Sequence, residues 1–404
     1  LYLRLYLLTW NVAEGPPVDL SEALELHKPK LPEVYAIGLQ EVYTSNSETK
    51  SGSWSEAITK LLAPKGYVRC KERSMLGIWI IVFIRKQMLP YVTNIESERT
   101  KTGFGGYWGN KGGVSVRMDI YGVNVIIVNS HLAAHMENVQ ERIEDYDSIL
   151  DDQKFKDEDV DHIMDHDYVF WMGDLNFRVN GITASDAIKC IKKDDYNHLL
   201  EHDQLLLSMK SGLVFDEFNE GDITFPPTYK FDKNTDHYDT SEKQRVPAWT
   251  DRILWYHHKV GYGNLRLNVQ QKKYQSHNDY KSSDHRPVSS IFQFQVFPHP
   301  PSQPISFLPI NEIKRKTDMT IKYTVDSTFM TNYNDWIGLY RTDFQSFNDY
   351  ITYIWAVEGG QFHGEKGVTL KFYKSYMTMK PGNYCLIYLT SKYSICGISA
   401  KFKV

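Results

Sequence analysis

Apolar runs recur along the first three quarters of the chain. The longest of them, residues 78–84, is far shorter than a membrane-spanning helix. Runs of this kind are typical of strands that are buried on both faces of a sheet. They predict strands over residues 1–9, 34–40, 78–84, 113–118, 123–129, 168–172, 252–256 and 287–296.

Segments between these runs carry apolar residues at helical spacing and predict helices over residues 53–62, 137–150 and 185–193. Strands that alternate with helices in this way form sheets covered by helices. The expected fold class of this part is therefore α/β, with a layered arrangement.

The pattern changes after residue 309 to short runs rich in Tyr and Ile, with no long helical segment. These runs predict strands over residues 319–325, 336–340, 350–355, 368–372, 383–389 and 397–402, which suits a small β-sandwich. Five of the thirteen residues from 297 to 309 are proline, and proline-rich segments run extended as linkers. We therefore expect a large domain over residues 1–297, a linker over 298–309 and a small all-β domain over 310–404.

Charge is distributed unevenly between these two parts of the 404-residue chain, whose net charge is −4. Residues 302–404 hold 12 Lys or Arg and 8 Asp or Glu, so this part carries +4 and the remainder −8. An acidic first domain disfavours binding to duplex nucleic acid, which needs a basic face. The basic second part is compatible with an anionic membrane surface, and equally with ordinary variation in surface charge. Four cysteines are too few for a disulfide framework and fit a reducing, cytosolic setting.

Polar side chains stand at the ends of four of the predicted strands. Asn11, Glu41 and His131 each follow one apolar run, and Asp174 and Asn176 follow a fourth. Sites in α/β folds are built at the carboxyl edge of the sheet, so these side chains are expected to meet there.

The residue types indicate the chemistry of that site. Six candidate residues carry side-chain oxygen atoms, which are the ligands that suit Mg²⁺: Asn11, Glu41, Asp174, Asn176, Asp251 and Asp284. Two histidines, His131 and His285, are suited to stabilise a developing phosphoryl charge. No Gly-x-x-x-x-Gly-Lys-Ser/Thr loop occurs, which excludes a P-loop nucleotide hydrolase. The implied reaction is Mg²⁺-assisted hydrolysis of a phosphoester by water.

Two longer motifs carry a specific resemblance. Trp171-Met172-Gly173-Asp174-Leu175-Asn176-Phe177-Arg178 resembles the W-x-G-D-x-N-x-R signature of inositol polyphosphate 5-phosphatases. Arg245-Val246-Pro247-Ala248-Trp249-Thr250-Asp251-Arg252 resembles the second signature of that family. Also similar are Trp108-Gly109-Asn110-Lys111-Gly112-Gly113, Ser130-His131-Leu132-Ala133-Ala134-His135 and Ser283-Asp284-His285-Arg286-Pro287, and all five occur in the family's order.

This resemblance covers about residues 5–297 and implies a four-layer, DNase I-like sandwich of the endonuclease/exonuclease/phosphatase type. The C-terminal region, with Asn334-Asp335-Trp336-Ile337-Gly338-Leu339-Tyr340 and Lys380-Pro381-Gly382-Asn383-Tyr384, resembles a SKICH domain. The combination is similar to the SKICH-containing members of the family, the skeletal-muscle- and kidney-enriched and the proline-rich 5-phosphatases.

The resemblance also implies roles for the site residues. Asp174 would act as general base, with Asn176 orienting phosphate or metal. His285, oriented by Asp251, and His131 would contact the scissile phosphate. The residues implied for the metal are Glu41, Asn11 and Asp284, and those implied for the substrate are Tyr229, Lys230, Lys243, Arg245 and Lys111, with Lys101 and Arg99 as weaker candidates. His135 is interpreted as structural.

The expected function is Mg²⁺-dependent removal of the 5-phosphate from phosphoinositides such as phosphatidylinositol 4,5-bisphosphate, PI(4,5)P2, and the 3,4,5-trisphosphate, PI(3,4,5)P3, and from soluble inositol polyphosphates. The expected partners are the phosphoinositide headgroup, a membrane surface contacted peripherally and a protein bound by the C-terminal domain, but no nucleic acid. The expected location is the cytoplasm, at the plasma membrane or the endoplasmic reticulum. Two alternatives stay open at this point: a nuclease of the same fold, and an inert adaptor that is targeted to membranes.

Overall fold

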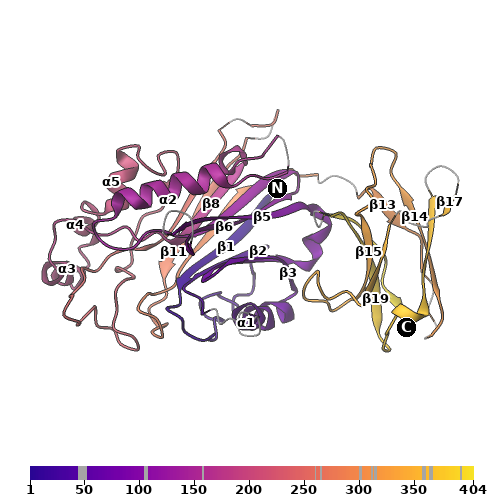
Figure 1. Ribbon diagram of the computed structural model, residues 1–404, viewed down its shortest axis with the longest axis horizontal. Coiled ribbons are helices and arrows are strands. Elements are labelled where there is room, and N and C mark those ends of the chain that lie inside the picture. Colours follow the sequence, from indigo (N-terminus) through magenta and orange to yellow (C-terminus); the bar gives the residue numbers. More distant parts are fainter. Residues whose placement is uncertain are drawn as a thin grey trace.

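The computed structural model describes residues 1–43, 52–103, 108–156, 159–259, 261–263, 266–299, 303–310, 313, 316–356, 361–363, 367–391 and 394–404. It consists of a large domain with two sheets and several helices, followed by a smaller domain built mainly of strands (Figure 1). In the described part of the chain, no helix combines the length and the apolar character that crossing a membrane requires.

Two six-stranded sheets form the large domain. The first has the order β11-β12-β1-β2-β4-β3, and its strands are β1 (Tyr2–Asn11), β2 (Val34–Gln40), β3 (Tyr67–Met75), β4 (Ile78–Arg85), β11 (Val269–Ser276) and β12 (Val288–Gln295). The second has the order β5-β6-β7-β8-β10-β9, and its strands are β5 (Val92–Gly103), β6 (Trp108–Ile120), β7 (Val123–His131), β8 (Tyr168–Asp174), β9 (Asn219–Glu220) and β10 (Asp251–His257). Each sheet contains one parallel pair, β1 with β2 and β7 with β8.

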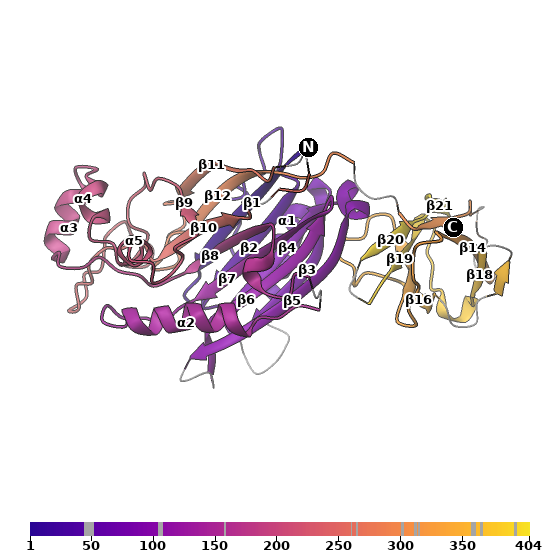
Figure 2. The same ribbon diagram turned by 90° about the horizontal axis from the view of Figure 1, so that it is seen from above.

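Alternate side chains of the central strands face different layers. In β1, Leu5 and Leu7 lie in the core between the two sheets, whereas Leu8 packs on the outer face of its own sheet. Helix α1 (Gly52–Leu62) covers that outer face, and α2 (Val139–Asp152) covers the outer face of the second sheet (Figures 1 and 2). The expected four-layer sandwich is confirmed.

Shorter helices complete the large domain. They are α3 (Ala184–Ile191), α4 (Tyr196–Leu200) and α5 (Gln204–Lys210), together with the 3-10 helices η1 (Ala63–Lys65), η2 (Lys86–Tyr91) and η3 (Ile163–Asp165). All eight predicted strands of this domain are present, with bounds that differ by a few residues. The strands β3, β5, β9 and β11 and the helices α4 and α5 were not predicted.

The small domain is a sandwich of two sheets around its own apolar core. One sheet contains β13 (Ile305–Phe307), β14 (Met319–Val325), β17 (Gln361–His363) and β18 (Gly367–Phe372); a 3-10 helix, η4 (Lys374–Tyr376), follows β18. The other contains β15 (Trp336–Arg341), β16 (Thr352–Trp355), β19 (Asn383–Leu389), β20 (Ile395–Ile398) and β21 (Phe402–Lys403). The expected all-β domain is confirmed.

Two predictions for this region are wrong in detail. The linker predicted over residues 298–309 contains β13, whose Ile305 pairs with Val325 of β14, so the sandwich begins before residue 310. Residues 300–302 of that linker lie outside the described residues. The single strand predicted over residues 397–402 is two strands, β20 and β21, which pair with different parts of β19.

The two domains pack against each other at the end of β4. Lys86, which follows β4, donates from Nζ to the backbone oxygens of Thr342 at 2.6 Å and Phe344 at 3.0 Å. On the edge strand β3, the backbone N–H of Arg69 donates to the oxygen of Gln345 at 2.8 Å. Because β4 runs antiparallel to β2, this junction lies at the amino end of β2, and the small domain occupies the end of the sheets away from the carboxyl ends of β1 and β2 (Figure 1).

Candidate active site

Register alone brings three predicted residues together at the carboxyl edge. Asp174, the last residue of β8, lies opposite His131 of the parallel strand β7 and opposite Asp251 of the antiparallel strand β10. On the facing sheet, Asn11 ends β1 opposite Gln40 of β2. Asp174 is thus the centre of the polar cluster at this edge.

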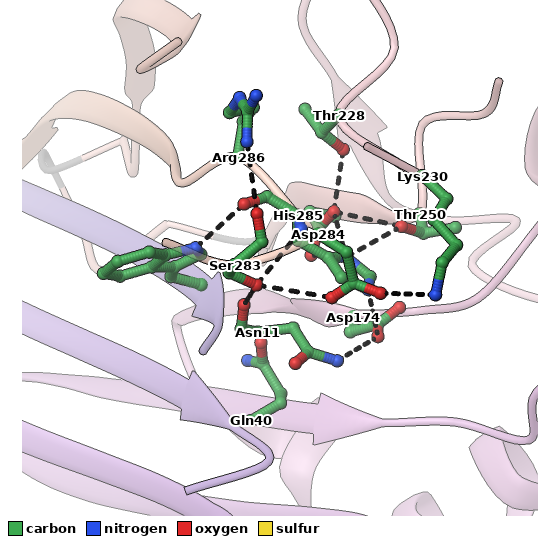
Figure 3. Close-up of polar contacts among 12 residues, drawn as sticks. Asn11, Gln40, Asp174, Thr228, Lys230, Thr250, Ser283, Asp284, His285 and Arg286 are labelled. Atoms are coloured by element: carbon green, nitrogen blue, oxygen red, sulfur yellow. Dashed lines mark hydrogen bonds and ion pairs between the residues drawn. The ribbon is translucent and has the colours of Figure 1, made fainter. Parts of the chain in front are cut away.

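Asp174 is fully buried and surrounded by donors. Its Oδ2 accepts from Asn11 Nδ2 at 2.9 Å and lies 3.3 Å from His131 Nε2 and 3.8 Å from His285 Nε2 (Figure 3). Burial by itself raises the pKa of the Asp174 carboxyl, but His285, His131 and Lys111 outweigh burial and hold this pKa well below its usual range. Asp174 is therefore an anion near neutral pH.

His285 forms the second part of the centre. Its Nδ1 lies 2.9 Å from Asp251 Oδ2, and the same carboxylate oxygen accepts from Thr228 at 2.7 Å and Thr250 at 3.0 Å. Burial lowers the pKa of His285, but the carboxylates of Asp251 and Asp174 outweigh it and raise this pKa to about 10. The ring is an imidazolium at neutral pH, as the predicted pairing with Asp251 requires.

His131 has the opposite protonation state. Burial, followed by the nearby ammonium of Lys111, lowers the pKa of its imidazole. Lys111 Nζ contacts His131 Nε2, and burial lowers the pKa of this lysine as well. Two histidines on either side of Asp174 thus differ in charge, one cationic and one neutral, because their environments push their pKa values apart.

Glu41 and Asn11 meet at this centre, but Asn11 does so with its nitrogen. Asn11 Nδ2 donates to Glu41 Oε1 at 3.1 Å as well as to Asp174, while Asn11 Oδ1 accepts from the backbone N–H of Ala13 at 3.0 Å. The amide oxygen therefore faces the backbone N–H of Ala13, while the amide nitrogen donates to both carboxylates. The metal-ligand role of Asn11 stays a prediction. The Glu41 side chain is 46% exposed, against 1% for Asp174, and so offers the accessible carboxylate.

Both polar atoms of the Asn176 side-chain amide form hydrogen bonds. Its Oδ1 accepts from Arg178 Nη2 at 2.6 Å, and its Nδ2 donates to the oxygen of Leu132 at 3.0 Å. The second hydrogen on Nδ2 has no partner among the described residues. The Arg178 guanidinium in turn lies over the ring of Tyr229, 4.3 Å from its centroid.

The predicted substrate residues Tyr229, Lys230 and Arg245 lie on the segments that precede β10. The Tyr229 ring centroid is 4.6 Å from that of His285. Lys230 Nζ donates to Asp284 Oδ2 at 2.7 Å, so Asp284 pairs with a lysine here, and its place in the metal site stays a prediction. Arg245 pairs with Asp239, with Nη1 3.2 Å from Oδ2.

The remaining candidates lie further from the centre. Lys243 is exposed and forms no hydrogen bond or ion pair with the described residues. Lys101 and Arg99 are exposed on β5, and Lys101 shares a separate cavity with Lys111. The backbone oxygen of His135 accepts from Arg142 at 2.7 Å, in keeping with a structural role.

A cavity of about 340 Å³ opens next to the centre and is lined by Glu41, Lys111 and His131, among others. A reacting group that enters it meets the accessible Glu41 carboxylate together with Lys111 and His131, whose Nε2 lies 3.9 Å from Glu41 Oε1.

Several residues that organise the centre were not singled out from the sequence. Thr228 and Thr250 hold Asp251, and Ser283 donates to the backbone oxygen of Asn11 at 2.6 Å while accepting from the backbone N–H of His285 at 3.1 Å (Figure 3). Arg178 aligns Asn176. Thr250, Ser283 and Arg178 lie inside the recognised motifs, so motif membership was the available signal, whereas Thr228 lies outside them, next to the predicted substrate residue Tyr229.

Comparison with known proteins places this geometry in a family. Residues 8–291 match the Endonuclease/Exonuclease/phosphatase family 2, and residues 305–404 match the SKICH domain. The chain is 37% identical to inositol polyphosphate 5-phosphatase K of Mus musculus, across 100% of this chain and 90% of that protein. The chain belongs to the inositol polyphosphate 5-phosphatase family.

Two further comparisons show which parts of the chain resemble other 5-phosphatases. The chain is 36% identical to phosphatidylinositol 4,5-bisphosphate 5-phosphatase A of Homo sapiens over 99% of this chain, but it spans only 41% of that protein's length. The 5-phosphatase domain of a synaptojanin, solved with inositol 1,4-bisphosphate and a calcium ion, superposes with a TM-score of 0.65 at 35% identity, over 73% of this chain and 86% of that chain. This 5-phosphatase therefore combines the enzyme domain of the family with a SKICH domain.

The fold by itself does not determine this chemistry. A nitrophorin from Cimex, solved as a ferrous NO complex, superposes with a TM-score of 0.61 at 26% identity, over 73% of this chain and 99% of that one. What identifies the present chain as an enzyme is the set of polar residues at the carboxyl edge together with its relatives.

Proposed function

We propose that the enzyme removes the 5-phosphate of phosphoinositides, PI(4,5)P2 and PI(3,4,5)P3 in particular, and of soluble inositol polyphosphates, with Mg²⁺ as its cofactor. The observation that carries the proposal is the buried Asp174 carboxylate, flanked by a cationic His285 and a neutral His131, beside the accessible Glu41. Two relatives are named as 5-phosphatases of inositol polyphosphates and of phosphatidylinositol 4,5-bisphosphate, and these names support the proposal.

The side chains at the centre fit a hard divalent cation. Asp174, Asp251 and His285 form a cluster whose possible ligand atoms lie within 4.8 Å of one another, but His285 is protonated and Asp251 already accepts from three donors. Glu41 and the neighbouring Asp174 are therefore the residues that would hold Mg²⁺, since both are carboxylates and Glu41 is open to solvent. Bound there, Mg²⁺ would neutralise phosphoryl oxygens and lower the pKa of a bound water.

Asp174 is proposed to orient the attacking water and to receive its proton. The carboxylate is held by Asn11 Nδ2 at 2.9 Å and by the backbone N–H of Asn176 at 3.2 Å, so its direction is fixed before substrate arrives. The second amide hydrogen of Asn176 would donate to the phosphate.

His285 is proposed to stabilise the negative charge on the phosphoryl group during in-line attack. Asp251 fixes its Nδ1–H, which directs Nε2–H towards the region of Asp174. His131 would assist as a neutral imidazole beside Lys111, whose ammonium supplies further charge.

Substrate selection is proposed to rest on Lys230 and Arg245, with the Tyr229 ring in contact with His285 and near Lys230. A ring that carries a 4-phosphate next to the reacting 5-phosphate needs cations of its own, since a desolvated dianion without partners is unfavourable. Lys230 and Arg245 are cations held in fixed positions, by Asp284 and Asp239.

We further propose that the enzyme acts in the cytoplasm, peripherally on the plasma membrane or the endoplasmic reticulum, and that the SKICH domain binds a protein partner there. The position of this domain, at the end of the sheets away from the catalytic centre, supports the proposal because it leaves the centre open to a lipid headgroup.

The test is phosphate release from short-chain PI(4,5)P2, PI(3,4,5)P3 and inositol 1,4,5-trisphosphate, with nicking of plasmid DNA as the control reaction. We expect Mg²⁺-dependent release from the inositol substrates and no nicking. Nicking without phosphate release would identify a nuclease, and loss of both reactions would identify an adaptor.

A second test addresses the metal ligand. Glu41→Gln keeps the shape of the side chain but removes its charge, so the Mg²⁺ concentration for half-maximal activity should rise about tenfold or more. The matched control is Glu14→Gln, an acidic residue lining the same cavity. An unchanged Mg²⁺ titration for Glu41→Gln would place the ion elsewhere.

A further inference from the structure

A cleft of about 770 Å³ opens between the two domains, at the end of the first sheet away from the catalytic centre. We call it the junction cleft. The large domain contributes Lys65, Arg85 and Lys86 to its wall, and Lys401 lines it from the small domain. Lys401 is more than three hundred positions away in sequence from the other three, so the cleft exists only when both domains are in contact.

The lining of the junction cleft carries positive charge only, although Asp343 and Asp349 of the small domain lie close enough to act on Lys86. No Asp or Glu occurs among the described residues that line it, and none of its four cations forms an ion pair with a described carboxylate. Lys86 contacts only neutral groups, two backbone oxygens and the ring of Phe344, whose centroid lies 3.8 Å from Nζ. Cations that gather without carboxylates repel one another unless an anion binds between them.

Two buried nitrogen donors at the cleft also lack partners. Arg85 Nε and Gln303 Nε2 are buried, and neither has a hydrogen-bond partner among the described residues. Both residues line the cleft, one from each side of the junction. Buried donors are almost always paired in folded proteins, so two unpaired donors in one cationic cleft indicate an acceptor that binds there.

The floor of the cleft is apolar. It is formed by Leu89 of the large domain and by Phe344, Cys385 and Ile387 of the small domain. The cleft thus combines a cationic rim with an apolar base.

We propose that the junction cleft binds a phosphomonoester, at a site separate from the catalytic centre. A dianion matches four cations better than a monocarboxylate does. Arg85 Nη2 donates to Leu31 and Tyr67, so Arg85 offers its unpaired Nε–H, which together with lysine ammonium groups can donate to phosphate oxygens. The ligand would bridge the domains, since Lys65, Arg85 and Lys86 lie on one side and Lys401 and Gln303 on the other. The phosphate comes either from a free ester or from the headgroup of an anionic lipid.

The experiment compares two doubly substituted full-length chains. Lys65→Glu/Lys401→Glu reverses two charges on the rim of the cleft, whereas Lys60→Glu/Lys403→Glu makes the same change in charge at exposed lysines that do not line it. The probes are glycerol 3-phosphate, followed by calorimetry, and phosphatidylcholine vesicles that contain phosphatidic acid, followed by co-sedimentation. Neither probe carries an inositol ring, and neither pair of substitutions touches the catalytic centre.

We expect the wild type and the Lys60/Lys403 variant to bind at least one probe equally, and the Lys65/Lys401 variant to bind it about tenfold or more weakly. The bound probe should raise the melting temperature of the first two proteins only. Binding of glycerol 3-phosphate that depends on the cleft identifies a free ester as sufficient, and cleft-dependent binding of vesicles alone identifies a lipid headgroup. The proposal is overturned if the two variants bind equally, or if the wild type binds neither probe.

Discussion

Positive side chains gather at two places in this molecule, the catalytic edge and the junction cleft, and their surroundings differ. At the catalytic edge, Lys230 and Arg245 each contact a carboxylate, at 2.7 and 3.2 Å. At the junction cleft, the four cations contact no described carboxylate. A paired cation is held in position before the ligand arrives, but the ligand has to displace the carboxylate. The catalytic edge therefore favours discrimination between ligands, whereas the cleft favours any anion of sufficient charge.

The largest effect is expected at the residue on which the catalytic edge converges. Asp174→Asn keeps the shape of the side chain but removes the proton acceptor, so kcat should fall by about 10² to 10⁴. The probe affinity of the junction cleft should not change, which separates the two regions. Near-normal turnover of the folded variant would remove Asp174 from the mechanism.

A pH-dependent effect is expected next, from Asp251→Asn. The Asp251 and Asp174 carboxylates outweigh burial and hold the pKa of His285 near 10, so the wild type keeps this imidazolium at pH 8. Without Asp251, burial is opposed only by the carboxylates of Asp174 and Asp284, so the pKa of His285 should fall and the imidazolium should be partly lost at pH 8. Activity at that pH should fall on the order of tenfold and recover in part as the pH is lowered. The pH–rate profile decides this, and an equal loss at all pH values would contradict it.

A smaller and selective effect is expected from the paired cations. Lys230→Ala or Arg245→Ala should lower kcat/KM for PI(4,5)P2 on the order of tenfold. Each substitution removes a charge-assisted hydrogen bond to the 4-phosphate. The loss is partly offset because the substrate no longer has to displace the carboxylate that pairs with the cation. The loss for PI(3,5)P2, which has no 4-phosphate, should be much smaller. Lys243→Ala, in the same loop but exposed, is the matched control. An equal loss for both substrates would show that these cations act only through general electrostatics.

The smallest effect on catalysis is expected at the junction. Lys86→Ala removes two hydrogen bonds from an ammonium to backbone oxygens of the small domain, which should lower the free energy of unfolding by roughly 1–3 kcal/mol. Turnover of a soluble inositol phosphate should stay within about twofold, since Lys86 lies far from the catalytic edge and takes no part in the chemistry. A parallel collapse of turnover in the folded variant would show that the two regions are coupled.

The strands that sequence patterns missed share one property. β3, β9, β5 and β11 are the four edge strands of the two large sheets, and all eight inner strands were predicted. Inner strands are buried on both faces and read as apolar runs, whereas edge strands carry charged and polar residues that prevent further pairing. β11, for example, buries only Val269 among its eight residues. The missed strands thus reflect the physics of sheet edges.

The candidate site was predictable to a similar degree. The rule that sites form at the carboxyl ends of strands is sufficient to find Asn11, Glu41, His131 and Asp174 from the sequence alone. It could not show which end of the Asn11 amide faces the centre, because that depends on the backbone N–H of Ala13. It also could not show that Asp284 pairs with Lys230, because loops bring those two residues together.

The contact between the domains also bears on how the enzyme domain behaves by itself. β3 ends its sheet with a row of backbone groups that could pair with another chain, and Ser346 of the small domain forms a parallel bridge with Arg69 at this edge. The small domain thus covers the edge of this sheet. A fragment that lacks the small domain would expose the edge strand β3 and the apolar side chain of Leu89 at the junction. Such a fragment should keep its chemistry yet be prone to self-association, because an uncovered edge strand is a template for aggregation.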